Sequence, residues 1–340
     1  MKKGRFVWAI AYGAVLCGFT AFVLLDTFTL PTAYDTNADK MNLSLFESTE
    51  VAEATTSESS AEETSTAERS RKSGGHSERS AEKVTEAVTE AAESAEGVSA
   101  GTSYSDENIT VTLTEYYEND TAIYVADVQL SSAQYLKTAF ANDTYGKNVT
   151  EKTSVMAEEN GAVLAINGDY YGAKESGYVI RNGILYRETG STDTDVLCIY
   201  ADGHFEITNS SEKTAQELID EGVWQAFSFG PALIEDGEIS VSEGEEVGKA
   251  MASNPRTAIG IIDDLHYVFV VSDGRTSESE GLSLSELAGF MQGLGVSTAY
   301  NLDGGGSSTM YFNGEIVNNP TTSGKSVKER SVSDIVYIGY

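Results

Sequence analysis

The stretch Ala299–Tyr311 reads AYNLDGGGSSTMY, and the expected fold is organised around it. Apolar residues lead into the acid Asp303, three glycines follow, and hydroxyl residues lead into a second apolar run. Three successive glycines lose much conformational entropy on folding, so they indicate backbone that needs positive φ or a close approach to a neighbour. Their amide groups can form a concave anion site beside a carboxylate at a strand end. A tight turn between two strands would explain the same pattern without any function.

Short β-rich runs surround this stretch throughout the C-terminal two thirds of the chain. Four Asx-Gly pairs separate such runs, and this is the strongest short-range signal of a β-hairpin. Helical spacing is confined to three segments, and Ser283 with Glu286 forms a capping box at the start of the last one. These patterns predict an α+β fold with a largely antiparallel or mixed sheet and a few helices. The expected strands are 109–113, 123–128, 135–139, 163–166, 196–200, 259–262, 267–271 and 335–338; the turns are 182–183, 202–203, 236–237 and 313–314; the helices are 154–160, 213–221 (after cap candidates Ser210 and Ser211) and 283–294.

The N-terminus combines a basic tail, residues 1–5, with an uncharged run from Phe6 to Leu25. Such a run is about as long as a helix that crosses a bilayer core, and preceding cations place the N-terminus in the cytosol. We therefore expect a transmembrane signal anchor over residues 6–25, with the rest of the chain exported to the extracellular side. A cleaved signal peptide remains the alternative, and it also implies export.

Residues 26–103 form a segment dominated by Glu, Ser, Thr and Ala, with no aromatic residue between Phe46 and Tyr104. Such a composition buries too little apolar surface to offset its ordering entropy, so we expect a disordered stalk. Residues 104–340 then have the length of one large domain. The net charge of −31 argues against nucleic-acid binding, which needs a basic face. The sequence gives no indication of the oligomeric state.

Several site classes are excluded. The three histidines have no zinc-ligand spacing, and His204 and His266 are better explained as turn residues than as members of a Ser-His-Asp triad. The glycine run lacks the lysine of a nucleotide P-loop, and no segment matches an EF-hand. Cys17 and Cys198 cannot form a disulfide within the exported part, and Cys198 in a strand-like run predicts a buried, inert thiol.

What remains is a set of acids and arginines, each at the end of an apolar run. Carboxylates can act as nucleophile, base or charge stabiliser, while guanidinium groups bind phosphate or carboxylate in a forked geometry. If the strand ends converge on one cleft, they would suit a substrate that is both sugar and phosphate. The set comprises Asp169, Asp273 and Asp303 with Arg256, Arg275 and Arg330.

Six motifs in this order resemble the phosphodiester glycosidase family, over roughly Asn167 to Tyr340. Its bacterial members are often labelled as exopolysaccharide-related. The resemblance implies hydrolysis of a sugar-1-phosphodiester, such as an N-acetylglucosamine-1-phosphodiester of an extracellular or cell-wall glycan, at the anomeric C–O bond. The motifs are Asn167–Tyr171, Phe229–Pro231, Pro255–Gly260, Asp273–Arg275, Asn301–Ser308 and Glu329–Arg330.

Candidate roles follow for each motif residue. Asp303 would serve the anomeric carbon as nucleophile or base, with Asp273 or Asp169 as partner or as ligand of sugar hydroxyls. The three arginines would bind the phosphate. Because a phosphate monoester is a good leaving group, stabilisation of its charge by the arginines would make a proton donor unnecessary. Further substrate contacts are expected from Asn167, Gly304, Gly305, Gly306, Ser307 and Ser308, and from Tyr170 and Tyr171 stacking on the sugar.

Two alternative functions stay open on the sequence alone. A non-catalytic module that binds anionic polysaccharide or cell wall would use the same arginines and tyrosines. A phosphodiesterase would cut the P–O bond instead. No cofactor is certain, but Asp169, Asp273 and Asp303 also suit a divalent cation.

Overall fold

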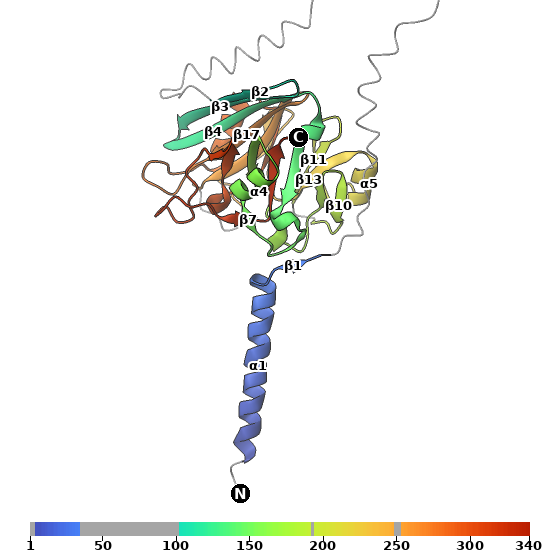
Figure 1. The fold of residues 1–340 in the computed structure, drawn as a ribbon, viewed down its shortest axis with the longest axis vertical. Helices are drawn as coiled ribbons and strands as arrows, with labels where there is room; N and C mark the ends of the chain where they lie inside the picture. The colour runs from blue at the N-terminus through green and yellow to red at the C-terminus, as the bar shows by residue number, and fades with distance from the viewer. Residues whose placement is uncertain (1–3, 35–101, 192–193, 248–252) are drawn as a thin grey trace, which may run out of the picture.

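The computed structural model describes residues 4–34, 102–191, 194–247 and 253–340 (Figure 1). Most of the predicted stalk, residues 35–101, lies outside the described residues. Every strand pair in the described part is antiparallel, so the expectation of an α+β fold with a largely antiparallel sheet is confirmed.

The largest sheet has eight strands and contains the start of the Ala299–Tyr311 stretch, whereas Met310 and Tyr311 belong to a strand of another sheet. The strand that leads into Asp303, β18, lies between β14 and β16, with Asn301 opposite Ala258. The alternation of buried and exposed residues along β3 fits a strand with one face on the core. In spatial order the strands are β15 (Glu238–Ile239), β14 (Ala232–Glu235), β18 (Thr298–Asn301), β16 (Arg256–Asp263), β17 (His266–Ser272), β4 (Thr121–Leu130), β3 (Ile109–Glu118) and β2 (Ser103–Ser105).

Two five-stranded sheets and two short ladders complete the β structure. The first five-stranded sheet has the order β10 (Ile184–Arg187), β9 (Val179–Arg181), β13 (Val223–Phe227), β11 (Asp195–Tyr200) and β12 (Phe205–Asn209). The second has the order β20 (Glu315–Ile316), β19 (Met310–Phe312), β8 (Leu164–Asn167), β22 (Asp334–Ile338) and β5 (Leu136–Phe140). The ladders pair β1 (Thr32–Ala33) with β6 (Gly146–Lys147) and β7 (Glu151–Lys152) with β21 (Ser331–Val332). All four predicted Asx-Gly turns join paired strands.

The described helices are α1 (Gly4–Phe28), α4 (Thr153–Glu159), α5 (Ala215–Asp220) and α6 (Leu284–Gly293), with short 3₁₀ turns η1 (Ala133–Tyr135), η2 (Ala141–Asp143), η3 (Tyr171–Ala173) and η4 (Gly305–Ser307). The predicted capping box of Ser283 and Glu286 is present at α6. At α5 the prediction of Ser210 or Ser211 as cap is wrong. Thr214 caps this helix because its hydroxyl accepts from the Glu217 amide while the Glu217 carboxylate accepts from the Thr214 amide.

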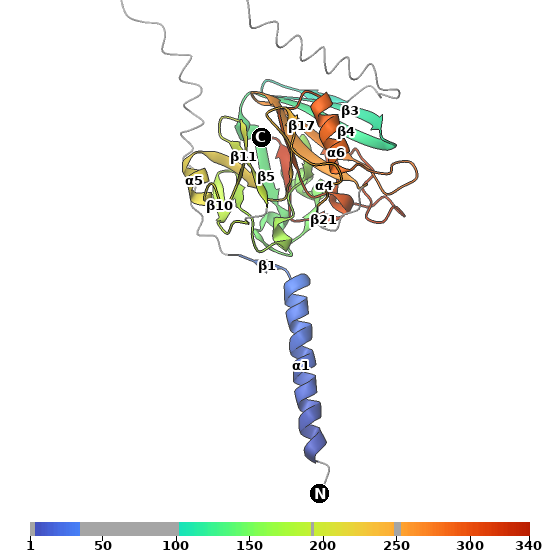
Figure 2. The same cartoon turned by 180° about the vertical axis from the view of Figure 1, so that it is seen from behind.

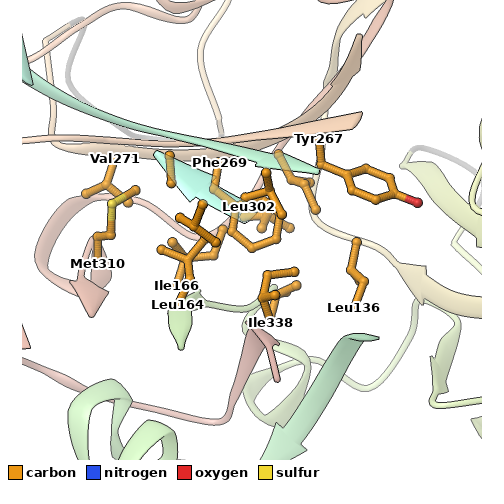
Figure 3. Close-up of a cluster of buried hydrophobic side chains, with 14 of the residues drawn as sticks. Leu136, Leu164, Ile166, Tyr267, Phe269, Val271, Leu302, Met310 and Ile338 are labelled. Carbon is orange, nitrogen blue, oxygen red and sulfur yellow. The ribbon is translucent and has the colours of Figure 1, made fainter. Parts of the chain in front are cut away.

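The main core lies between the eight-stranded sheet and the sheet of β8 and β22. Figure 3 shows Leu164, Ile166 and Ile338 facing Phe269, with Leu302 between them. Each such buried side chain contributes roughly 1.5–3 kcal/mol of transfer free energy. Helix α6 covers the outer face of the large sheet (Figure 2), and α4 packs on the outer face of the other. The two layers thus bring the ends of β8 and β18 together.

Helix α1 projects from the globular part in Figure 1 and contains the uncharged run. Within the residues that the structure describes, no helix combines the length and the hydropathy of a membrane span. The predicted transmembrane anchor over residues 6–25 and the extracellular location stay predictions. Cys17 is exposed and Cys198 is buried, which confirms the buried thiol, and burial raises the pKa of Cys198.

Candidate functional site

Asp303 lies directly after β18, and its backbone is fixed by the end of β8. Its amide donates to the Gly168 carbonyl at 3.2 Å, and its carbonyl accepts from Asn167 Nδ2 at 2.6 Å. Asn167 Oδ1 in turn accepts from the Thr257 hydroxyl at 2.9 Å. Asn167 is fully buried, so it positions the Asp303 loop, and the predicted substrate contact by Asn167 is wrong.

The three glycines after Asp303 each face a neighbour that leaves no room for a side chain. A Cβ on Gly304 would lie 2.9 Å from the Pro255 carbonyl oxygen, and one on Gly305 would lie 2.8 Å from Arg275 Nη2. Gly305 also has a φ of +64°, which favours glycine. A Cβ on Gly306 would lie 2.6 Å from Arg330 Nη2. The absence of side chains in the glycine run therefore lets the guanidinium groups of Arg275 and Arg330 pack directly against the backbone.

The three predicted arginines converge around this loop. Arg256 is buried, pairs with Glu246 and donates through Nε to the Leu282 carbonyl at 2.7 Å. Arg275 donates to Asn254 Oδ1 through Nη2 at 2.9 Å. Burial lowers the pKa of Arg275, and the nearby charges of Arg330 and Arg256 lower it further. Three like charges held this close favour an anionic ligand between them.

A cavity of about 200 Å³ lies beside Asp303. Burial raises the pKa of the Asp303 carboxyl to about 6, against the opposing effects of the Ser307 hydroxyl and of the Arg330 and Lys174 charges. A carboxyl with such a pKa is suited to exchange protons near neutral pH. The cavity is lined by Phe229, Val247, Asn254, Arg256, Arg275, Asn301, Leu302, Asp303, Gly304 and Gly305.

Asp169 belongs to a buried ion-pair cluster rather than to the cavity wall. It is 1% exposed, and its Oδ1 lies 2.9 Å from Nη2 of Arg181, which also lies 2.9 Å from Oδ2 of Asp334. Burial opposes ionisation, but Arg181 and the Ser228 amide hold the pKa of Asp169 below its usual value. Burial and the Asp169 charge raise the pKa of Asp334 to about 7. The negative charge of Asp169 raises the pKa of Asp303.

Sequence reasoning missed Arg181 and Asp334. Arg181 ends the otherwise apolar strand β9, and Asp334 begins the apolar strand β22. A charged residue next to such a run is a signal, but their pairing depends on strands that are distant in sequence.

Asp273 is committed to a structural network. It is 5% exposed, and its carboxylate accepts from the side-chain amides of Asn318 and Asn319, the Asn319 backbone amide and the Tyr124 hydroxyl. These bonds tie the end of β17 to β4 and to the segment after β20. Asp273 does not line the cavity, so its predicted catalytic role is not supported by the geometry.

The serines and tyrosines predicted to contact substrate differ in their exposure and in the neighbours that they contact. The Ser307 hydroxyl lowers the pKa of Asp303, whereas Ser308 is fully buried and accepts from Thr257, so the predicted substrate contact of Ser308 is wrong. Tyr170 is 46% exposed with a φ of +64°. Tyr171 is 2% exposed and stacks on Tyr145, so it cannot stack on a sugar and that prediction is wrong.

Lys174 and Phe229 are further residues at the site that the sequence did not single out as a pair. Lys174 Nζ donates to the Ser228 carbonyl at 3.1 Å and lies 4.7 Å from the centre of the Phe229 ring, which lines the cavity. Burial lowers the pKa of Lys174, while the charges of Asp169 and Asp303 raise it. The positive charge of Lys174 therefore interacts with the carboxylates of both Asp169 and Asp303.

The predicted cation ligands do not assemble. Asp169 pairs with Arg181, and Asp273 accepts from amides. Across the described ranges, no group of three or more His, Cys, Asp or Glu side chains is arranged to hold a metal ion.

Comparison with known proteins agrees with the site. Residues 160–339 match the family model described as phosphodiester glycosidase. The YomE protein of Bacillus subtilis, named as prophage-derived and uncharacterized, is 28% identical over 201 residues, covering 58% of this chain and 31% of that protein. The mouse enzyme N-acetylglucosamine-1-phosphodiester alpha-N-acetylglucosaminidase is 30% identical over 186 residues, covering 50% of this chain and 35% of that protein. The chain thus spans about a third of the length of these relatives.

Solved structures show the same fold. The catalytic domain of the zebrafish N-acetylglucosamine-1-phosphodiester alpha-N-acetylglucosaminidase, auto-inhibited by its pro-peptide, matches with a TM-score of 0.55 at 20% identity over 72% of this chain and 87% of that one. A hypothetical protein from Synechocystis matches with a TM-score of 0.51 at 15% identity over 70% of this chain and 63% of that one.

Proposed function

The chain belongs to the phosphodiester glycosidase family, a class of hydrolases, and from this premise we propose that it hydrolyses a sugar-1-phosphodiester at the anomeric C–O bond. One observation carries the proposal. A single cavity presents the Asp303 carboxyl, with its raised pKa, beside the guanidinium groups of Arg256 and Arg275. A carboxylate for the sugar carbon and cations for the phosphate are the two requirements of this reaction.

In the proposed reaction Asp303 acts as general base. It takes a proton from water, the water oxygen bonds to the anomeric carbon, and the bond from that carbon to the phosphate oxygen breaks with its electrons. The phosphate leaves as a monoester, so the products are a free sugar and a phosphomonoester. Because Asp169 and Asp273 are committed to other partners, Asp303 performs this step as the one carboxylate among the described residues that line the cavity.

The leaving phosphate needs charge stabilisation rather than a proton. Arg275 and Arg330 lie against Gly305 and Gly306, where the backbone permits their approach. Guanidinium groups pair with phosphate oxygens in a bidentate manner and remain charged throughout. Lys174 assists by favouring the ionised form of Asp303.

The sugar that we propose for first trial is N-acetylglucosamine. Two relatives of comparable identity, from mouse and cattle, carry the name N-acetylglucosamine-1-phosphodiester alpha-N-acetylglucosaminidase. An extracellular or cell-wall glycan, exopolysaccharide included, is the proposed source of such a substrate.

We propose an exported setting on the basis of the basic residues 1–5 and the uncharged run 6–25. Protease added to intact cells should degrade the domain if this is correct. Protection of the domain until the cells are lysed would place it in the cytosol instead.

The experiment compares the wild-type chain with Asp303→Asn on an N-acetylglucosamine-1-phosphodiester. Turnover should fall about 10²–10⁴-fold, the usual contribution of a general base. Binding of a non-hydrolysable phosphonate analogue should change little, because the arginines remain. Asp236→Asn, in the turn between β14 and β15, is the matched control and should keep wild-type turnover.

The outcomes separate the alternatives. Binding without any turnover in the wild type would favour a polysaccharide-binding module. Sugar-1-phosphate as product would identify a P–O phosphodiesterase. Loss of turnover with a chelator, restored by a divalent cation, would add a metal to the mechanism.

A further inference from the structure

A second hollow adjoins the Asp303 cavity, and we call it the basic groove. It encloses about 580 Å³ and is lined by Lys152, Thr322, Ser323, Ser326, Lys328 and the segment Glu329–Ser331. Three of its side chains are cationic, and several others carry hydroxyl groups that bind phosphate oxygens well. This composition suits an anionic ligand.

The backbone fixes the cations of the basic groove in place. Pairing of β7 with β21 sets Lys152 opposite Ser331, next to Arg330. The Lys328 amide donates to the Pro320 carbonyl at 2.7 Å. The opposite wall is a loop that Gly324 brings against Arg275, where a Cβ would lie 1.9 Å from the Arg275 carbonyl oxygen.

The acid in this lining offsets one of the three positive charges, so the basic groove keeps a net charge of +2. Glu329 is 8% exposed, and its carboxylate accepts from both the amide and the hydroxyl of Ser154 at 2.7 Å. The rest of the domain is strongly acidic, because residues 102–340 contain 13 Lys and Arg against 37 Asp and Glu, a net charge of −24. A positive hollow on such a domain is a local exception that needs a ligand to explain it.

The basic groove and the Asp303 cavity share a wall. Arg275, which lines the cavity, donates through Nη1 to the Thr322 carbonyl at 2.7 Å. The ideal Cβ position of Gly306 lies 2.6 Å from both Arg330 Nη2 and Thr322 Oγ1, which belong to the groove. A phosphate held between Arg275 and Arg330 would therefore have the sugar on the Asp303 side and its other ester group on the groove side.

We propose that the basic groove binds the aglycone of the substrate, and that this aglycone carries at least one further phosphate. The substrate is then a phosphodiester-linked polyanion rather than an isolated diester with a neutral alcohol. The orientation of the aglycone rests on the proposed function, whereas the affinity of the basic groove for phosphate does not.

The test uses the full-length chain and two N-acetylglucosamine-1-phosphodiesters, one of methanol and one of glycerol 3-phosphate. The double variant Lys152→Gln/Lys328→Gln removes two groove charges and leaves Asp303 and the arginines intact. The ratio of kcat/KM for the phosphorylated aglycone to that for methanol should fall about tenfold, through KM, since each exposed charge pair is worth a modest part of a tenfold effect. Lys137→Gln, on β5 opposite Tyr337 at the far end of the β22 ladder, removes one charge away from the basic groove and serves as the control, which should keep the wild-type ratio.

A wild-type enzyme that shows no preference for the phosphorylated aglycone, or an unchanged ratio in the double variant, overturns the proposal. If neither diester is hydrolysed, the proposed function fails. Calorimetry then measures whether tripolyphosphate binds to the basic groove. Binding that weakens about tenfold in the double variant, and not in Lys137→Gln, then supports the groove as a polyphosphate site. Absent or equal binding in all three proteins overturns it.

Discussion

At the scale of single residues, the character of the site comes from Asp303. Its backbone is held by the Asn167 side chain and the Gly168 carbonyl, and burial raises the pKa of its carboxyl from 3.8 to about 6. The same burial that suits the group for proton transfer makes its ionised form unfavourable in the folded state. Function and stability therefore oppose each other at this position.

Asp303→Asn should stabilise the protein at about pH 8 even though it lowers turnover. The pKa of Asp303 is higher in the folded than in the unfolded state. Its contribution to the free energy of unfolding is therefore favourable below pH 3.8 and is lost as the pH rises through about 6. The free energy of unfolding at pH 8 should rise in the variant by up to about 3 kcal/mol. Urea unfolding at pH 4 and pH 8 measures this, and the difference between the proteins should be small at pH 4. A variant less stable than wild type at pH 8 contradicts the role assigned to burial.

At the scale of elements, the loop after β18 depends on glycines, because a side chain at Gly305 or Gly306 would collide with a neighbouring guanidinium group. Gly306→Ala would place a methyl group 2.6 Å from Arg330 Nη2, so the guanidinium group must shift. A displacement of about 1 Å can lower kcat/KM by about a hundredfold. We expect a loss of about tenfold to a hundredfold in steady-state assays, with a folded protein by circular dichroism.

Gly289→Ala in α6 is the matched control, because no atom lies within 4 Å of its Cβ position. It should keep wild-type kcat/KM and gain up to about 1 kcal/mol in stability from helix propensity. Equal effects of the two substitutions on kcat/KM would mean that the loop does not depend on close approach at Gly306.

The cluster of Arg181, Asp169 and Asp334 joins β9, the end of β8 and β22. Removing the cation with Arg181→Met leaves two carboxylates buried without compensation, which should lower the free energy of unfolding by about 3–5 kcal/mol. Lys213→Met is the comparison, because Lys213 also bridges two acids, Glu206 and Glu221, but is partly exposed. Its loss should stay below about 1 kcal/mol. Urea unfolding of both variants checks the contrast, and similar losses would contradict it.

At the scale of the whole molecule, local features were predictable from the sequence and long-range pairing was not. The four Asx-Gly turns and the capping box of α6 depend on neighbouring residues alone, and all are present. The insertion of β18 between β14 and β16 depends on strands distant in sequence, so no local pattern specifies it. The two-layer arrangement follows only once these pairings are known.

The same difference between local features and long-range contacts applies to the residues of the site. Asp303 was recognisable because the glycine run makes an unusual local demand on the backbone. Tyr171 and Asp273 were misassigned because a sequence does not tell whether a side chain at a strand end points into a cavity or into the interior. Lys174 and Arg181 escaped attention because their partners come from distant parts of the chain.

The central claim is that the whole assembly serves cleavage at the anomeric carbon, and hydrolysis in water enriched in ¹⁸O tests it most directly. An N-acetylglucosamine-1-phosphodiester would be incubated with the wild-type chain, and both products would be analysed by mass spectrometry. The account predicts that ¹⁸O enters the released sugar, that the phosphomonoester stays unlabelled, and that Asp303→Asn forms both products about 10²–10⁴-fold more slowly. Label in the phosphate product would contradict the account, because the bond broken would then be P–O.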